Sequence, residues 1–166
     1  MSQQRARRSW PTLVAGLSMA GLHAQEPGRP LDLATFPRTT LEITHQGGGQ
    51  VHKFPFQVWV ADTPERSAQG LMFVSDLPET MGMVFPVMPP RIENMWMKNT
   101  YIELDMLFID AHGRVTKIIQ RAAPLSLQTL SSDTPVSAVL ELRGGQAAKL
   151  GLQNGDAVSW KKPAAQ

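Results

Sequence analysis

The chain has 166 residues, of which 42% are hydrophobic and 18% charged, and it contains no cysteine. This length and composition predict one folded domain with short tails and exclude an intrinsically disordered chain. The lack of cysteine excludes disulfide bonds, thiolate zinc sites, iron–sulfur clusters and a cysteine nucleophile.

Residues 1–24 have the pattern of an export signal. Arg5, Arg7 and Arg8 precede an uncharged stretch, 12–22, and Ala24 offers a small residue for cleavage. As a helix this stretch would span only about 16 Å, too short for a bilayer core of about 30 Å. We therefore expect cleavage near Ala24 and a periplasmic or extracellular protein without an integral membrane span. A retained N-terminal anchor is the alternative, and the arginine pair leaves both general and twin-arginine export open.

The signal also explains the charge of the chain. The formal net charge is +2, but removing three arginines from sixteen basic residues leaves thirteen against fourteen acidic ones, a net charge of −1. A near-neutral domain with evenly spread basic residues is not expected to bind nucleic acid.

The rest of the chain is predicted to be a linker at 25–38, a single β-rich domain at 39–162 and a tail at 163–166. The linker is rich in proline and has no periodicity. Strands are expected at 40–44 and 51–60 around a triple-glycine turn, with Pro55 at an edge or bulge. A helix is expected from Pro64 to about Leu71, capped by Asp62 or Thr63, with Ala68 and Leu71 on its buried side.

Short strands continue along the chain. They are expected at 83–85, 92–97, 104–110, 115–119, 136–142 and 157–160, with a second helix at 146–150 that stops at Gly151. The turn at 110–113 predicts a tight hairpin. Many short strands without βαβ alternation predict a mainly β fold, either an antiparallel, jelly-roll-like sandwich or a barrel, with one or two short helices.

Several motifs together resemble one known family. They are Gly70-Leu71-Met72-Phe73, Gly82-Met83-Val84-Phe85, Trp96-Met97-Lys98-Asn99-Thr100, and the run from Leu104 to Asp110, followed by Val139-Leu140-Glu141-Leu142 and Gly155-Asp156. Over about residues 54–160 the chain resembles the family catalogued as domain of unknown function 192. The resemblance implies an exported domain with a mostly β, sandwich-like fold and no established activity. Val74 and Glu103 depart from the family pattern, which has arginine and proline there.

The densest polar group of the sequence is the segment from Trp96 to Thr100 with the acids that follow it. If this segment is a strand, Trp96, Lys98 and Thr100 share one face. We expect a binding surface for an anion or a sugar made of Asp62, Arg66, Trp96, Lys98, Asn99, Thr100 and Asp105. The structural alternative makes Asn99 a turn former and Asp105 a partner of Lys98 or of backbone amides.

Seven of the nine methionines lie between positions 72 and 106. Thioethers bind Cu(I), so Met81, Met83, Met95 and Met97 form a candidate copper site. Packing in an irregular core is the alternative, and it is favoured because methionine fills such cores well. No cofactor is otherwise expected.

Enzyme signatures are weak. There is no G-x-S-x-G motif, and the histidines lack metal-site spacing. A hydrolase with Asp105 or Asp62 as general base remains an alternative, as does a paired-carboxylate glycosidase using Asp105 and Glu141. The favoured function is an exported binding or accessory module for a small molecule or a protein partner, monomeric or weakly dimeric.

Overall fold

The computed structural model describes residues 30–161, so the predicted signal peptide and the C-terminal tail lie outside the described residues. The elements, in chain order, are η1 (Leu33–Thr35), β1 (Arg38–Gly47), β2 (Gln50–Val60), α1 (Pro64–Gln69), β3 (Met81–Arg91), β4 (Asn94–Met95), β5 (Leu104–Ile109), β6 (Val115–Ala122), β7 (Leu130–Ser131), β8 (Val136–Arg143), α2 (Gln146–Leu150) and β9 (Ala157–Trp160). Among these residues no helix is both long and apolar enough to cross a membrane.

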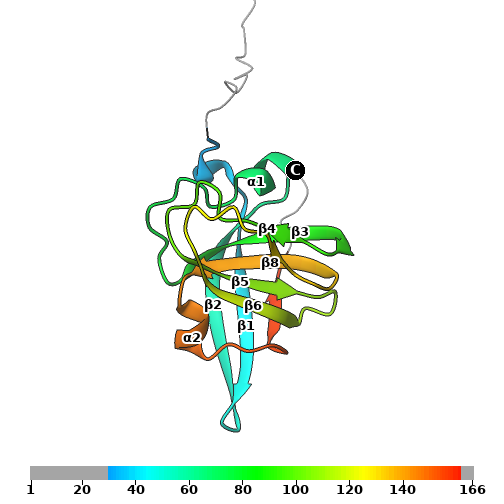
Figure 1. The fold of residues 1–166 in the computed structure, drawn as a ribbon. Coiled ribbons are helices and arrows are strands. Elements are labelled where there is room, and N and C mark those ends of the chain that lie inside the picture. The colour runs from blue at the N-terminus through cyan, green and yellow to red at the C-terminus, as the bar shows by residue number, and fades with distance from the viewer. Residues whose placement is uncertain (1–29, 162–166) are drawn as a thin grey trace, which may run out of the picture.

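Seven strands form one curled sheet in the order β6-β5-β8-β3-β2-β1-β9, and β4 pairs with β7 in a small second sheet (Figure 1). The mainly β prediction is confirmed, but purely antiparallel pairing is wrong because β2 and β3 run parallel. Parallel neighbours need a crossover connection, and the segment that contains α1 supplies it. Within the described residues, the edges of the sheet are joined by one isolated bridge, between Arg114 and Ala157, and by a few neighbouring backbone hydrogen bonds. Strands β6 and β9 do not pair, so the sheet does not close into a barrel.

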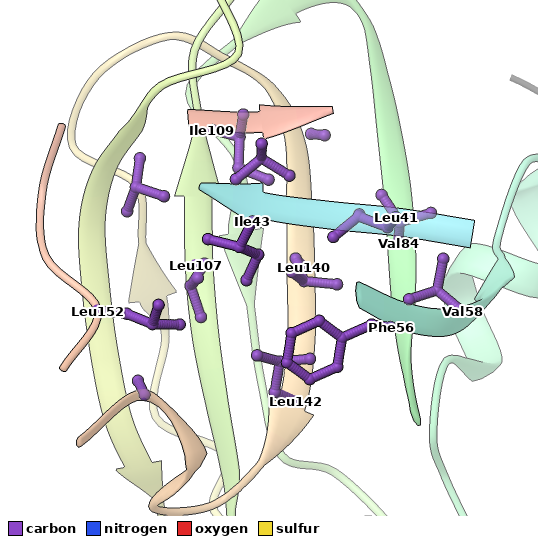
Figure 2. Close-up of a cluster of buried hydrophobic side chains, with 14 of the residues drawn as sticks. Leu41, Ile43, Phe56, Val58, Val84, Leu107, Ile109, Leu140, Leu142 and Leu152 are labelled. Carbon is purple, nitrogen blue, oxygen red and sulfur yellow. The ribbon is translucent and has the colours of Figure 1, made fainter. Parts of the chain in front are cut away.

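The sheet curls around the first core cluster, which is drawn in Figure 2. Leu41 and Ile43 on β1 face this cluster because strand side chains alternate, and both are fully buried. Strands β5 and β8 contribute Leu107, Leu140 and Leu142 to the same cluster. Burial of this apolar surface is the main force that holds the sheet in its curl.

The other face of β3, β5 and β8 carries the second core cluster, which includes Met83, Met106 and Val139. Connecting segments cover this face, since Leu71 and Met97 come from loops and pack in the same cluster. All six residues of β5 are buried, as expected for a strand with apolar material on both faces. The candidate functional site lies on this second face.

Short sequence patterns predicted the positions of several elements correctly. The β1–β2 hairpin turns at Gly48 and Gly49, both with positive φ, which is the backbone of a type I′ turn. Pro55 pairs only with β1, because β3 joins β2 from Gln57 onward, so its edge position is confirmed. The first helix begins at Pro64 with Thr63 as its cap.

Two details of these elements differ from expectation. The first helix ends at Gln69, two residues earlier than expected, because Gly70 follows with a φ of 51°. Ala68 is exposed and does not face the core. The described part of the predicted linker packs on the domain: Phe36 is buried, and Leu31 exchanges hydrogen bonds with the side chain of Gln69.

Asp105 on β5 joins three parts of the backbone. Its Oδ1 accepts hydrogen bonds from the amides of Arg121 (2.8 Å) and Gly145 (2.9 Å), and its Oδ2 accepts one from Ala147 (2.7 Å). The residue is fully buried. A buried carboxylate must be satisfied in this way, and the amide of Ala147 belongs to the first turn of α2. Asp105 therefore fixes the end of β6 and the start of α2 against β5.

Replacing Asp105 by alanine should cost about 3 kcal/mol or more of unfolding free energy, because three buried amides lose their acceptor. Urea denaturation followed by circular dichroism measures this loss. Asp62→Ala is the matched control: it removes an acid from a more exposed ion pair and should cost less than about 1 kcal/mol. Equal effects of the two substitutions would contradict the role given to Asp105.

Candidate functional site

Glu141 is an acidic residue buried in the middle of the sheet. On β8 it lies directly opposite Met83 of β3 and Met106 of β5, and both of these methionines are fully buried. Only 4% of Glu141 is exposed. Its side chain shares the sheet face of Val139, two residues earlier, and so belongs to the face that carries the second core cluster.

Within residues 30–161 the carboxyl group of Glu141 has no hydrogen bond and no ion pair. Burial raises its pKa from the ordinary value of 4.5 to about 8, because the charged form would lose its hydration. The group is therefore a neutral carboxylic acid at pH 7. In that form it can donate one hydrogen bond and accept others.

The Glu141 pocket lies over this carboxyl group and holds about 250 Å³. Three stretches of chain line it besides β8: the end of α1 with the residues after it, the middle of β3, and the segment that carries β4. The lining residues are Ser67, Ala68, Gln69, Gly70, Leu71, Met72, Phe85, Pro86, Val87, Arg91, Glu93, Asn94, Met95, Trp96, Lys98, Thr100 and Glu141. About half of this lining is apolar, and the ionisable side chains in it are Arg91, Glu93, Lys98 and Glu141.

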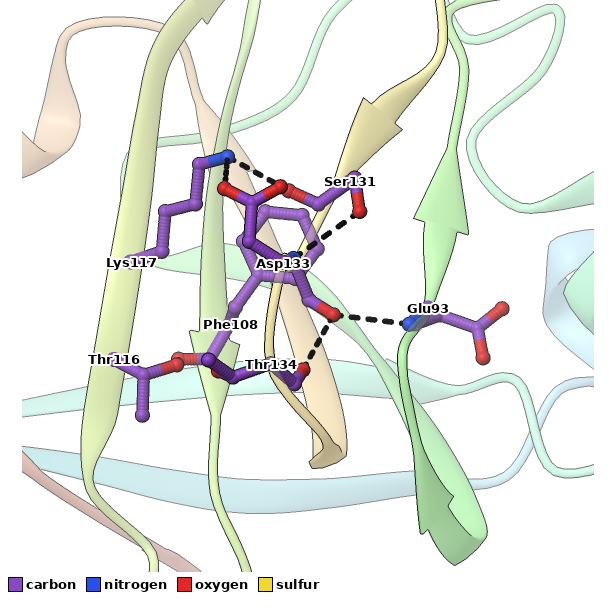
Figure 3. Close-up of polar contacts among 8 residues, drawn as sticks. Glu93, Phe108, Thr116, Lys117, Ser131, Asp133 and Thr134 are labelled. Carbon is purple, nitrogen blue, oxygen red and sulfur yellow. Dashed lines mark hydrogen bonds and ion pairs between the residues drawn. The ribbon is translucent and has the colours of Figure 1, made fainter.

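One wall of the pocket is anchored by a polar network, shown in Figure 3. The amide of Glu93 donates to Ser132 Oγ (3.0 Å), and the amide of Ser132 donates to the Glu93 carbonyl (2.9 Å). Ser132 Oγ donates in turn to the carbonyl of Thr134 (2.7 Å). Lys117 of β6 holds the neighbouring segment through Asp133 Oδ2 (2.6 Å). The wall that carries β4 is thereby fixed to the main sheet.

The strand predicted for residues 92–97 is present only as β4, Asn94–Met95, and the chain turns after it. Asn99 has a φ of 55°, and the amide of Thr100 donates to the Met97 carbonyl (3.1 Å). Carbonyls of this turn accept hydrogen bonds from the amides of Phe73 (2.8 Å) and Leu125 (3.0 Å). The prediction that Trp96, Lys98 and Thr100 share a strand face is therefore wrong, whereas the alternative role of Asn99 as a turn former is confirmed.

Three residues of the predicted binding surface do line the pocket. They are Trp96, Lys98 and Thr100, although a turn and not a strand brings them there. The ammonium of Lys98 lies 5.7 Å from the centre of the Trp96 ring, within range of a cation–π contact. Asn99 contacts Met72 through its side-chain amide, 3.8 Å from the sulfur.

The other three residues of that surface have different contacts. Arg66 Nη1 lies 2.5 Å from Asp62 Oδ1, and its guanidinium also reaches the Thr35 carbonyl and the ring of Phe36. Asp105 accepts hydrogen bonds from backbone amides on the opposite face of the sheet. None of these three residues lines the Glu141 pocket. Asp105 and Glu141 cannot act as a carboxylate pair, because their side chains point to opposite faces.

The four methionines of the copper alternative all belong to the second core cluster. Met83 and Met97 are fully buried members, and Met81 and Met95 pack against it partly buried. This is the arrangement that core packing requires. Among the described residues, no group of three or more histidine or acidic side chains is placed to hold a metal ion. A copper site on these sulfurs stays a prediction.

From the sequence, Glu141 was a candidate only as one half of a carboxylate pair with Asp105, and Arg91 and Glu93 were overlooked. A signal for Glu141 was present, since one acid interrupts the otherwise apolar run from Val139 to Leu142. An acid in such a run must be paired, neutral or functional. Arg91 and Glu93 form an ion pair of 2.9 Å at the pocket, and no local sequence pattern indicates this pair.

The raised pKa of Glu141 makes stability depend on pH. Between about pH 5 and 8 the folded protein keeps a proton that the unfolded chain has lost, so the free energy of unfolding falls as pH rises through this window. Glu141→Gln removes this contribution. The variant should match the wild type near pH 5 and exceed it by about 3 to 5 kcal/mol at pH 8, at about 1.4 kcal/mol per pKa unit.

Urea denaturation at unit steps of pH from 5 to 8 measures the difference between wild type and variant. Other titrating groups are common to both proteins and cancel in that difference. A difference that stays constant over the window would show that Glu141 is ionised in the folded protein, which would contradict its burial as a neutral acid.

Comparisons with known proteins agree with this geometry. The chain is similar to a crystal structure of "a putative transcription regulator" from Sinorhizobium meliloti 1021, with 34% identity and a TM-score of 0.70 over 75% of this chain and 95% of the other. A protein of unknown function from Novosphingobium aromaticivorans DSM 12444 shares 38% identity, with a TM-score of 0.67 over 73% of this chain and 84% of the other. No curated protein matches the chain.

The family comparison covers most of the described domain. The model of DUF192, described as "Uncharacterized ACR", matches residues 43–160, which include the second half of β1, all the other strands of the sheet and the Glu141 pocket. The resemblance drawn from the sequence motifs is thereby confirmed, and the chain belongs to the DUF192 family.

Proposed function

We propose that this protein is an exported domain that binds a small molecule in the Glu141 pocket. The observation that carries the proposal is a carboxyl group that is nearly fully buried, has no partner among the described residues and lines a pocket. Buried polar groups in folded proteins are normally satisfied, and each exception calls for an explanation. A ligand that hydrogen-bonds to Glu141 supplies that explanation.

The lining of the pocket supports a small-molecule ligand. Phe85, Val87 and Leu71 provide apolar walls, and about half of the lining residues, Glu141 and Thr100 among them, offer polar groups. A concave site that combines apolar walls with polar groups can both bury a ligand and orient it. Trp96 is 53% exposed at the pocket and offers an aromatic face on which a ligand can stack.

A hydrolase is the second candidate, and one observation favours it, with Glu141 as a general acid in place of the predicted general base. Glu141, protonated at neutral pH and facing a pocket, has the property required of a general acid. The originally predicted bases, Asp105 and Asp62, are engaged by backbone amides and by Arg66. Turnover of a bound compound that is lost in Glu141→Gln would favour the hydrolase, whereas binding without turnover favours the binding domain.

A bulky residue at position 68 should block the pocket. Ala68 lines the pocket and is exposed on α1, so Ala68→Trp fills space without disturbing the core. In thermal-shift assays with a set of small organic acids, amino acids and sugars, ligands should raise the Tm of the wild type by a few degrees and leave that of Ala68→Trp unchanged. Ala148→Trp, at an exposed position of α2, is the control and should respond like the wild type.

Two results would contradict the pocket. One is a ligand that stabilises wild type and Ala68→Trp equally, since its site would then lie elsewhere. The other is a complete set of compounds without a single shift in the wild type, because the unsatisfied carboxyl group would then have no small-molecule partner.

Export is the other part of the proposal, and the basic, then apolar, N-terminus supports it. When the full chain is produced in a bacterium with an outer membrane, we expect the periplasmic fraction to contain a protein that begins near Gln25. Intact-mass spectrometry of that fraction measures the N-terminus. Protein that keeps Met1 and remains in the cytoplasm would contradict export.

A further inference from the structure

The charges around the Glu141 pocket are unbalanced. Arg91 and Glu93 pair at 2.9 Å, which leaves Lys98 as a lining cation without a carboxylate partner in the described chain. Lys98 is itself exposed, and its contact is the Trp96 ring. With Glu141 neutral, the pocket is lined by two cations, Arg91 and Lys98, and one anion, Glu93, so it carries a net positive charge.

Among residues 30–161, no other charged group that lines the pocket or lies opposite Glu141 in the sheet alters this balance. Opposite it on β3 and β5 stand Met83 and Met106, and the α1 residues that line the pocket are uncharged. Arg143, two residues further along β8, does not line the pocket and pairs with Asp76 at 3.4 Å. Asp105 points to the opposite face of the sheet.

This arrangement distinguishes between classes of ligand. A cationic ligand would meet Lys98 and Arg91 and would require Glu141 to ionise in an apolar environment, which burial opposes. An anionic ligand can pair with the ammonium of Lys98 and accept a hydrogen bond from the neutral carboxyl group of Glu141. Phe85 and Val87 in the lining offer apolar surface to the hydrocarbon part of such a ligand.

We propose that the ligand is a small organic anion that places its charged group near Lys98 and Arg91 and presents an uncharged hydrogen-bond acceptor to Glu141. The proposal rests on the proposed function, since it names the ligand class of the same pocket. The acceptor is a carbonyl, ether or hydroxyl oxygen, because a neutral carboxyl group donates its single proton to such an atom.

Four probes of equal carbon number separate the parts of this proposal. They are 2-oxobutanoate, which has both charge and acceptor; butanoate, which has only the charge; 2-butanone, which has only the acceptor; and butylamine, which is a cation. Methionine methyl signals in NMR spectra report binding directly, because Met72 and Met95 line the pocket. We expect 2-oxobutanoate to shift these signals with a Kd of about millimolar, as suits a seven-atom ligand, and to bind more tightly than butanoate. 2-Butanone and butylamine should leave the signals unchanged.

Variants test each contact. Lys98→Gln should weaken 2-oxobutanoate binding at least about fivefold, while Lys53→Gln, which removes an exposed lysine on β2, should have no effect. Glu141→Leu should abolish the preference for 2-oxobutanoate over butanoate. Far-UV circular dichroism confirms that each variant is folded.

The pH dependence of binding separates a direct contact between Glu141 and the ligand from a purely structural role of Glu141. Wild-type affinity for 2-oxobutanoate should fall between pH 7 and 9, because Glu141 loses its proton near pH 8 and then repels the anion. Glu141→Gln keeps a donor that does not titrate, so its affinity should be constant over this range.

The results separate this inference from the proposed function. Tighter binding of butylamine than of either acid would overturn the anionic class and leave a ligand pocket in place. The same conclusion follows if no probe shifts the methionine signals while a sugar from the thermal-shift set binds in the wild type and not in Ala68→Trp. If neither experiment finds a ligand, both proposals are overturned.

Discussion

The fold depends on the buried carboxylate of Asp105 and the three backbone amides that donate hydrogen bonds to it. Through them one side chain fixes the end of β6, the glycine before α2 and the first turn of that helix. The first of these segments ends β6 and the other two follow β8, and β6 and β8 are not neighbours in the sheet because β5 lies between them. In an apolar interior a charge-assisted hydrogen bond is strong, and an unmet donor is costly. The interaction therefore holds β5, β6 and the chain after β8 in one arrangement, and with them the register that places Glu141.

Two acids in the same sheet have opposite environments, because strand side chains alternate between faces. Asp105 lies opposite Leu142, and Glu141 lies opposite Met106, one position along the same ladder. Asp105 points toward backbone amides and is satisfied, whereas Glu141 points toward methionines and the pocket. A buried carboxyl group without a partner lowers stability at neutral pH, and its retention is understandable if a ligand satisfies it.

The parts of the fold that could be predicted were those fixed by neighbouring residues. The Thr63-Pro64 start of α1, the turn at Gly48 and Gly49, and α2 from Gln146 to Leu150 depend on capping, positive φ and helix stops within a few positions. The turn at Asn99 was one of two alternatives, since the strand predicted at 92–97 could also have continued through it. Its shape depends on hydrogen bonds to Phe73 and Leu125, which lie about 25 residues away on either side. Likewise, nothing local indicates that β3 pairs with β2 in parallel.

The sequence by itself determined the mainly β class, most strand positions, the absence of disulfide bonds and membership of the DUF192 family, because these follow from residue types and short-range patterns. It also placed three pocket residues, Trp96, Lys98 and Thr100, in one candidate surface. Only the tertiary structure showed that Asp105 is structural and that Glu141, Arg91 and Lys98 share a pocket. The physical reason is that burial and charge balance are set by groups from separate strands and loops, which meet only when the sheet has formed.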